Sequence, residues 1–172
     1  MMLVRYVNEF LNDLKFIFLL ENKGKIKLGK KMLSKVKPFI QDSNDKLEAG
    51  GVLLGRFLKD SKNIIIDDVT VPMKGDIRKR NYFKRGRQKH QQIIDQAWKE
   101  SDGTCNYLGE WHTHAENYPT PSSLDYKEWK RKLKEDKFSS RFLYFIIVGI
   151  KSIRVWEGDR RTLKIKRINH HG

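Results

Sequence analysis

Three apolar segments follow one another in the last part of the chain with only short polar turns between them, and this pattern strongly constrains the fold. The segments run from Phe142 to Ile150, from Ile153 to Glu157 and from Leu163 to Ile168. Such short runs between polar turns are typical of β-strands, and strands joined by short turns pair antiparallel. The sequence therefore predicts a mostly antiparallel sheet at this end of the chain.

The rest of the chain alternates between helix-like and strand-like segments, which predicts a mixed α/β fold of the α+β kind. Apolar residues at spacings of three and four indicate helices over residues 30–40 and 88–99, and from Ser122 or Ser123 to about residue 136. Short apolar or alternating runs predict strands over residues 14–20, 25–28, 50–58, 64–71 and 106–114. With 172 residues and no visible linker, we expect one domain over residues 1–172.

The net charge of +15 predicts attraction to an acidic partner, whether nucleic acid, a membrane surface or an acidic protein. Charge alone does not distinguish these classes. The densest basic stretch runs from Lys74 to Lys89, where eight basic residues accompany one acid, Asp76. This stretch is a candidate contact surface, with a solvated loop as an equal alternative.

Cysteine usage and the first residues of the chain bear on the compartment. Cys105 is the one cysteine, so no intramolecular disulfide can form and the cytoplasm is the expected compartment. Charged residues, among them Arg5, Glu9 and Asp13, interrupt the apolar N-terminal segment before an export signal or membrane span could form. We therefore expect no membrane association.

The segment around His112 has the composition of a metal site. His112 and His114 lie two residues apart in a predicted strand, so both imidazoles can point to one face and bind one ion. Asp125 follows across a loop stiffened by Pro119 and Pro121, where the chain can fold back and supply a third ligand. Three protein ligands leave a tetrahedral zinc ion one open position, which is typical of a catalytic site.

A catalytic site of this kind also needs a general base, and two glutamates are candidates. Glu48 comes just before an apolar segment that begins Gly50-Gly51, where glycine permits close approach of neighbouring backbone. Glu110 shares strand parity with both histidines and could face the same ion. Spacing alone leaves the two open.

Together these residues resemble the JAMM motif of the JAB/MPN metalloproteases: Glu, then His-x-His, seven residues, Ser, two residues and Asp. The matching positions are Glu48, His112, His114, Ser122 and Asp125. The resemblance implies the JAB/MPN fold, a mixed, mostly antiparallel curved sheet flanked by about three helices and similar to the cytidine deaminases. It also implies one Zn²⁺ per chain on His112, His114 and Asp125, with Glu48 as base and Ser122 bonded to the oxyanion.

The segments from Gly109 to His114 and from Pro119 to Ser123 are similar to those of bacterial JAB proteins encoded in CBASS antiphage operons. That resemblance implies a zinc isopeptidase of antiviral defence that removes ubiquitin-like conjugates. The bond cleaved would follow the C-terminal residue of a CD-NTase-like cyclic-nucleotide synthase, which a partner E1/E2-like ligase attaches to target proteins. Ala115 stands where many relatives carry proline, so a looser loop is expected after His114.

Six residues ahead of the middle helix interleave aromatic and basic side chains: Arg78, Lys79, Arg80, Tyr82, Phe83 and Lys84. We expect them to bind an extended substrate tail by strand addition.

Parts of the sequence are also compatible with functions other than an isopeptidase. The basic charge also fits a nucleic-acid-associated JAB protein of the DNA-repair type without peptidase activity. A zinc deaminase is excluded, because no Pro-Cys-x-x-Cys follows the histidines. A scaffold that has lost its ligands is disfavoured, because all five motif positions are filled. His90, His170 and His171 are expected to be solvated and without catalytic duty.

Overall fold

Eight strands form one sheet in the computed structural model, which describes residues 16–171. Their spatial order is β1-β2-β4-β3-β7-β8-β9-β10. The bounds of the strands are β1 Ile17–Leu19, β2 Lys25–Leu28, β3 Gly50–Phe57, β4 Ile64–Val69, β7 Asn106–Thr113, β8 Phe142–Val148, β9 Ile153–Asp159 and β10 Ile165–Ile168. Every segment of the described range that the sequence predicts as a strand is therefore a strand, with ends shifted by a few residues.

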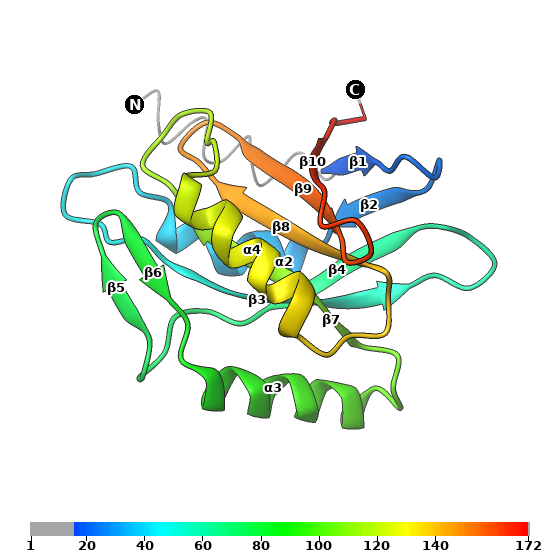
Figure 1. Ribbon diagram of the computed structural model, residues 1–172. Helices are drawn as coiled ribbons and strands as arrows, with labels where there is room; N and C mark the ends of the chain where they lie inside the picture. Colours follow the sequence, from blue (N-terminus) through cyan, green and yellow to red (C-terminus); the bar gives the residue numbers. More distant parts are fainter. Residues whose placement is uncertain (1–15, 172) are drawn as a thin grey trace.

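The sheet is mixed, mostly antiparallel and curved, as predicted (Figure 1). Among the strands of residues 16–171, only the pairs β2–β4 and β7–β8 are parallel. The curvature brings the β1 edge against the chain that follows β10. There the Leu19 amide donates to Asn169 O at 3.0 Å and the His171 amide donates to Ile17 O at 2.8 Å.

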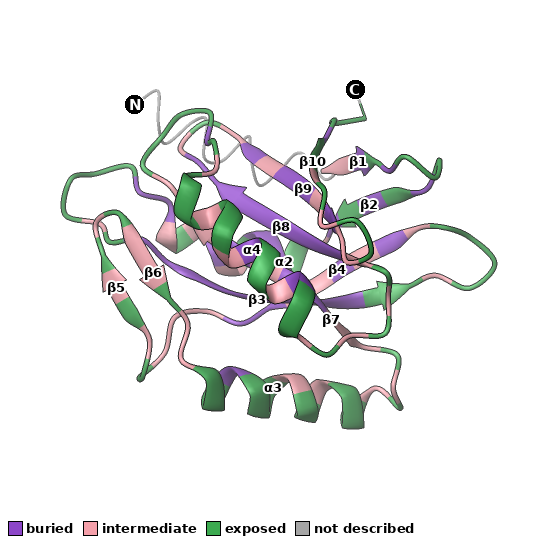
Figure 2. Ribbon diagram, viewed as in Figure 1, coloured by how far each residue is buried: buried purple, intermediate pink, exposed green. Residues whose placement is uncertain are grey.

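Two helices cover the sheet from opposite sides, and β8 shows how the core divides between them. The helices are α2 (Lys30–Val36) and α4 (Ser123–Glu135), and a 3₁₀ turn that contains Pro38, Lys37–Phe39, follows α2. Alternate β8 side chains enter two apolar clusters. Tyr144, Ile146 and Val148 join the α2 cluster, whereas Leu143, Phe145 and Ile147 pack with Trp129 and Leu133 of α4. Figure 2 shows the resulting buried strands between more exposed helices.

The third helix, α3 (Arg87–Glu100), lies apart from α4 near β3 and β7 (Figure 1). Its apolar stripe is only partly covered: Ile94 and Ala97 are half-buried, whereas Trp98 is 53% exposed. The helix is anchored mainly by His90, which is fully buried. The prediction that His90 is solvated is therefore wrong.

A two-stranded hairpin that the sequence analysis did not identify as strands precedes α3. It consists of β5 (Ile77–Lys79) and β6 (Tyr82–Lys84), joined by a two-residue turn. Asp76 closes its base, since one carboxylate oxygen accepts from the Gly86 amide at 2.7 Å and also contacts His90 Nε2 at 3.0 Å. Thr70 Oγ1 lies 2.6 Å from the other imidazole nitrogen and anchors this cluster to β4.

Gly109 allows β7 and β8 to pair where no other residue fits. Its φ is +136°, and a Cβ built there would lie 1.8 Å from the carbonyl oxygen of Tyr144. We predict that Gly109→Ala lowers the free energy of unfolding by about 2 kcal/mol or more beyond the effect of Gly75→Ala. Gly75 is the matched control, because its φ is +105° but nothing lies within 4 Å of its Cβ position. Equal urea midpoints for the two variants would contradict this packing.

Some predictions reach residues outside the described range. No helix within residues 16–171 is long and apolar enough to cross a membrane. The expected absence of an export signal rests on residues before Phe16, and the single domain over residues 1–172 includes them, so both stay predictions.

Candidate active site

The register between β3 and β7 determines where Glu48 stands relative to the histidines. Gly50 lies opposite His112 in this antiparallel pair, and two bonds extend the pairing by one residue on each strand. The Thr113 amide donates to Ala49 O at 2.8 Å, and the Ala49 amide donates to Thr113 Oγ1 at 2.9 Å. Because side chains alternate between faces, Glu48 lies on the same face as His112 and His114.

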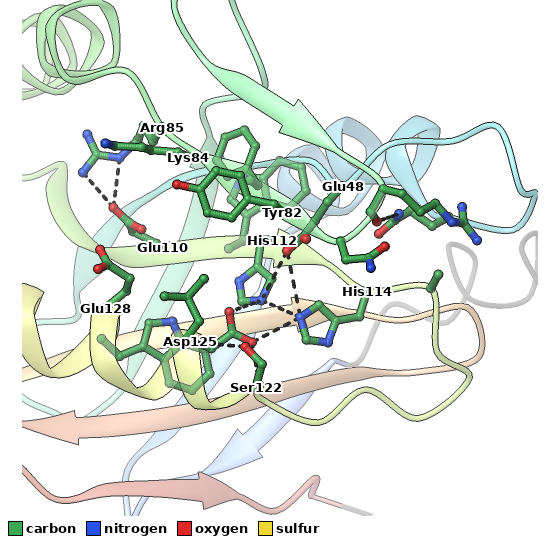
Figure 3. A pocket seen from close by; sticks show the side chains of 18 of the residues that line it. Glu48, Tyr82, Lys84, Arg85, Glu110, His112, His114, Ser122, Asp125 and Glu128 are labelled. Carbon is green, nitrogen blue, oxygen red and sulfur yellow. Dashed lines mark hydrogen bonds and ion pairs between the residues drawn. The ribbon is translucent and has the colours of Figure 1, made fainter.

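Asp125 completes a group of three side chains with the two histidines (Figure 3). The Nε2 atoms of His112 and His114 are 3.0 Å apart. The Asp125 carboxylate approaches both, with Oδ1 3.4 Å from His112 Nε2 and Oδ2 3.2 Å from His114 Nε2. Ligands of a tetrahedral zinc ion at 2.0–2.1 Å stand about 3.3 Å from one another. The nitrogen and oxygen donors present here therefore fit such an ion.

The Glu48 carboxylate lies slightly farther from the two histidines than the Asp125 carboxylate does. Its Oε1 is 3.9 Å from the Nε2 atoms of both histidines, so one ligand atom from each of these three residues lies within 4.8 Å of the others. The Asp125 carboxylate therefore approaches the two imidazoles more closely than the Glu48 carboxylate does. Burial raises the pKa of the Glu48 carboxyl, although both imidazoles act in the opposite direction.

Ser122 and Asp125 hold each other at the first turn of α4. Ser122 is the N-cap, as predicted, and its Oγ accepts a hydrogen bond from the Asp125 amide at 3.1 Å. Asp125 Oδ2 in turn accepts from the Ser122 amide at 2.8 Å, completing a capping box. Burial alone would raise the pKa of Asp125, but hydrogen bonds from the two histidines and the Ser122 amide hold it well below its ordinary value. The carboxylate is thus fixed in orientation and charge.

Glu116 supports His114 from the side opposite the three-residue group. Its Oε1 lies 3.0 Å from His114 Nδ1, and its Oε2 accepts from the Thr120 amide and hydroxyl, both at 3.3 Å. A carboxylate on the second ring nitrogen leaves Nε2 free as a ligand atom and fixes the plane of the ring. No role was expected for Glu116 from the sequence. A carboxylate two residues after a candidate ligand histidine could have predicted this contact with the imidazole.

The contact between Glu116 and His114 predicts an effect of Glu116 on zinc affinity. Glu116→Ala should weaken zinc binding by about 10–100-fold, as loss of a supporting carboxylate does at other zinc sites. Glu116→Gln keeps an acceptor for the ring and should lose less. Competition with a chromogenic chelator measures both affinities, and Glu135→Ala on the exposed side of α4 is the control. An affinity for Glu116→Ala equal to that of the wild type would show that the contact does not orient His114.

The loop between His114 and α4 is held at several points. The Ile150 amide donates to Glu116 O at 2.7 Å and the Lys151 amide donates to Asn117 O at 3.1 Å. The Arg154 guanidinium contacts the carbonyl oxygens of Tyr118 and Pro119, the latter at 3.2 Å. The structure therefore gives no support for the looser loop expected from Ala115.

Glu110, the alternative base, lies in a separate ion cluster (Figure 3). Its Oε1 accepts from Arg85 Nη2 at 2.7 Å and lies 3.1 Å from Lys132 Nζ. Burial would raise the pKa of Glu110, but the two cations outweigh it and lower this pKa below its ordinary value. A carboxylate bound by two cations is a poor proton acceptor, which leaves Glu48 as the better base.

A pocket of about 670 Å³ opens over the three-residue group and is lined by four of the six residues expected to bind substrate, whereas Arg78 and Lys79 are not part of its lining. Tyr82, Phe83 and Lys84 of β6 form one wall and α4 forms the other. Phe83 also packs on Gly50, where a Cβ would lie 2.6 Å from its ring. Arg80 differs from the others, because its guanidinium donates to Ser43 O at 2.7 Å and Lys46 O at 2.8 Å. Both bonds come from Nη1, and they attach the side chain to the loop before β3 at the pocket wall.

Known proteins resemble this chain in sequence and in fold. Residues 40–160 match the family of prokaryotic homologs of the JAB domain, which is more than half of the chain. The chain belongs to the prokaryotic JAB family. The fold and the resemblance predicted from the sequence are therefore confirmed.

Several curated relatives of this JAB protein carry the name CD-NTase/cGAS isopeptidase. One from Pseudomonas aeruginosa is 37% identical over 129 residues, covering 75% of this chain and 80% of its own length. One from Vibrio cholerae is 34% identical over 118 residues, covering 69% and 72%. One from Escherichia coli is 29% identical over 158 residues, covering 92% and 95%. The similarity thus extends over most of each protein.

Among solved structures, a solution structure of a protein from Desulfitobacterium hafniense is similar, with a TM-score of 0.58 and 17% identity. The match covers 83% of this chain and 88% of that one. At this identity the likeness supports the fold alone.

Proposed function

We propose that this JAB protein is a zinc-dependent isopeptidase that cleaves ubiquitin-like conjugates made through the C-terminus of a CD-NTase-type synthase in CBASS antiphage defence. The observation that carries the proposal is the placement of one buried carboxylate, Glu48, 3.9 Å from both imidazoles of a group that fits zinc, at the floor of an open pocket. The names of the relatives support the choice of substrate.

His112, His114 and Asp125 would hold one zinc ion per chain. The bound ion supplies Lewis-acid polarisation of the scissile carbonyl and of water. Glu48 then accepts the proton of the attacking water and delivers it to the leaving amine, because its carboxylate lies beside the ligand group on the pocket side. Burial raises the pKa of the Glu48 carboxyl and so favours the protonated form that carries the proton to the amine.

Ser122 is placed to stabilise the oxyanion that forms on the substrate. Its Oγ already accepts a hydrogen bond from the Asp125 amide, so the hydroxyl hydrogen is the part left for a partner. Ser122 also lines the pocket, where the carbonyl oxygen of a substrate would develop negative charge. The helix-capping role and the catalytic role are therefore compatible.

The β5–β6 hairpin offers an edge for an extended substrate tail. On the β5 side, Lys79 O accepts from the Glu48 amide at 2.8 Å, so that edge is occupied. Within residues 16–171, β6 pairs with no strand other than β5, and its other edge borders the pocket. A tail added there would pass Tyr82 and Lys84 on its way to the three-residue group. Specificity for the tail would then come from these side chains.

The substrate assignment is tested by mapping a cut. The protein is incubated with a fusion that joins the C-terminus of the synthase to a reporter protein, and intact mass is measured. Cleavage immediately after the last synthase residue supports the proposal. Cleavage elsewhere, or equal cleavage of a fusion with an unrelated C-terminal tail, would rule out the assigned substrate. The synthase and its E1/E2-like ligase are the proposed partners, and the cytoplasm the proposed compartment.

Nucleic-acid binding is the second candidate function, and the net charge of +15 favours it. The stretch from Lys74 to Lys89 contributes less than its sequence suggests. Three of its four arginines, Arg78, Arg80 and Arg85, are bound to backbone carbonyls or to Glu110. DNA affinity measured at several salt concentrations tests this alternative: a steep salt dependence without any peptidase activity would favour it over the isopeptidase.

A further inference from the structure

Glu48 stands one residue beyond the β3–β7 ladder, so the sheet alone does not fix its backbone. The pairing of β3 with β7 ends at Ala49, which bonds with Thr113. Both peptide groups of Glu48 are bound instead by β5: its amide donates to Lys79 O at 2.8 Å, and its carbonyl accepts from Arg78 Nε at 3.0 Å. The hairpin, more than the sheet, therefore fixes the backbone position from which the Glu48 side chain extends.

Arg78 is the centre of this attachment. Its Nη2 also donates to Leu47 O at 3.2 Å, so one guanidinium binds two successive carbonyls. Its planar group lies over the Phe39 ring, 5.4 Å from the centroid, which limits its rotation. Lysine carries all of its donors on one nitrogen, so it does not reproduce an arrangement in which Nε and Nη2 each bind one carbonyl.

The same hairpin also packs on β3 next to the metal site. Phe83 pairs with Arg78 across the hairpin and packs on Gly50, which lies opposite His112 in the sheet. The hairpin wall of the pocket therefore contacts both the backbone of the base and the strand that pairs with the histidine strand. A shift of the wall would move Glu48 relative to the histidines.

We propose that Arg78 is a positioning residue for Glu48. In this proposal the β5–β6 hairpin and the Glu48 backbone move together as one rigid unit. This inference rests on the proposed function and adds to it a residue that touches neither substrate nor metal. Displacing a reacting group by about 1 Å can lower a rate about 100-fold. Loss of Arg78 should therefore lower kcat much more than it changes KM.

The test compares Arg78→Ala and Arg78→Lys with the wild type and with Arg56→Ala. Arg56 is a matched control, since it makes an exposed bidentate ion pair with Asp67 toward the other end of β3. We expect kcat of Arg78→Ala to fall about 100-fold with KM changed by less than about threefold and zinc content unchanged. Arg78→Lys should recover only part of kcat. Guanidinium ion added to Arg78→Ala should restore kcat at least about tenfold, and Arg56→Ala should match the wild type.

Hydrogen–deuterium exchange provides a second readout that does not depend on activity. In Arg78→Ala, amides of residues 43–49 should exchange faster, while those of α4 stay unchanged. A variant with wild-type kcat, or with a changed KM alone, would overturn the positioning role. If Arg78→Ala folds poorly, the test uses Arg78→Lys. Unchanged hydrogen exchange and an unchanged kcat in that variant would also overturn the positioning role. A wild type that cleaves nothing overturns the proposed function, whereas exchange in residues 43–49 still decides whether the attachment exists.

Discussion

Glu48→Gln should lower kcat by about 10³-fold while leaving zinc binding intact. Glutamine keeps the size of the side chain but cannot accept the proton, and proton transfer by a placed base is worth about 10²–10⁴-fold in rate. Zinc binding should persist, because Glu48 lies farther from both imidazoles than Asp125 does. Steady-state cleavage of the synthase fusion gives kcat, and metal analysis of the purified variant gives the zinc content.

Glu110→Gln is the control that separates the two candidate bases. Glu110 neutralises Arg85 and Lys132, so the variant should lose about 1–3 kcal/mol of stability and keep kcat per folded molecule within a few fold. The reverse pattern, in which Glu110→Gln is inactive and Glu48→Gln is active, would assign the base to Glu110. Thermal unfolding of both variants shows which losses come from folding.

Asp125→Asn should weaken zinc binding by more than about 100-fold and abolish detectable cleavage. A loss of this size exceeds what removal of a supporting partner costs, because the variant removes a charged ligand. Asparagine still offers an oxygen to the Ser122 amide, so the capping box is largely kept and α4 should remain folded. Zinc affinity is measured by chelator competition.

Ser122→Ala serves as the complementary control for Asp125→Asn. It removes the cap acceptor for the Asp125 amide but keeps the carboxylate. It should cost about 1 kcal/mol of stability and leave zinc affinity within a few fold. An Asp125→Asn variant that binds zinc as tightly as Ser122→Ala would show that Asp125 is not a ligand.

The sequence was sufficient for the parts of the site that depend on strand parity and local spacing. His112 and His114 share a face because they lie two residues apart in β7, and Asp125 reaches them because α4 begins just before it. Glu48 was a different case, because the β3–β7 register that places it on this face is a long-range pairing. No local pattern encodes such a register, and the resemblance to a family supplied it.

Other features depend on tertiary contacts that leave weak traces in a sequence. His90 looks like a solvated residue of a charged helix, yet it is buried between Thr70 and Asp76 from another part of the chain. The basic stretch from Lys74 to Lys89 suggested a charged surface, but three of its four arginines bind backbone carbonyls or Glu110. Net charge counts such residues as free, so it overstates the cationic surface available to a partner.

One experiment bears on the whole proposal: cleavage of the synthase fusion by the purified wild-type protein, first as prepared, then after treatment with a zinc chelator, and then after zinc is added back. The proposal predicts cleavage after the last synthase residue, its loss on chelation and its return with zinc. Cleavage that persists with zinc removed, or a zinc-loaded protein that leaves the fusion intact, would contradict it.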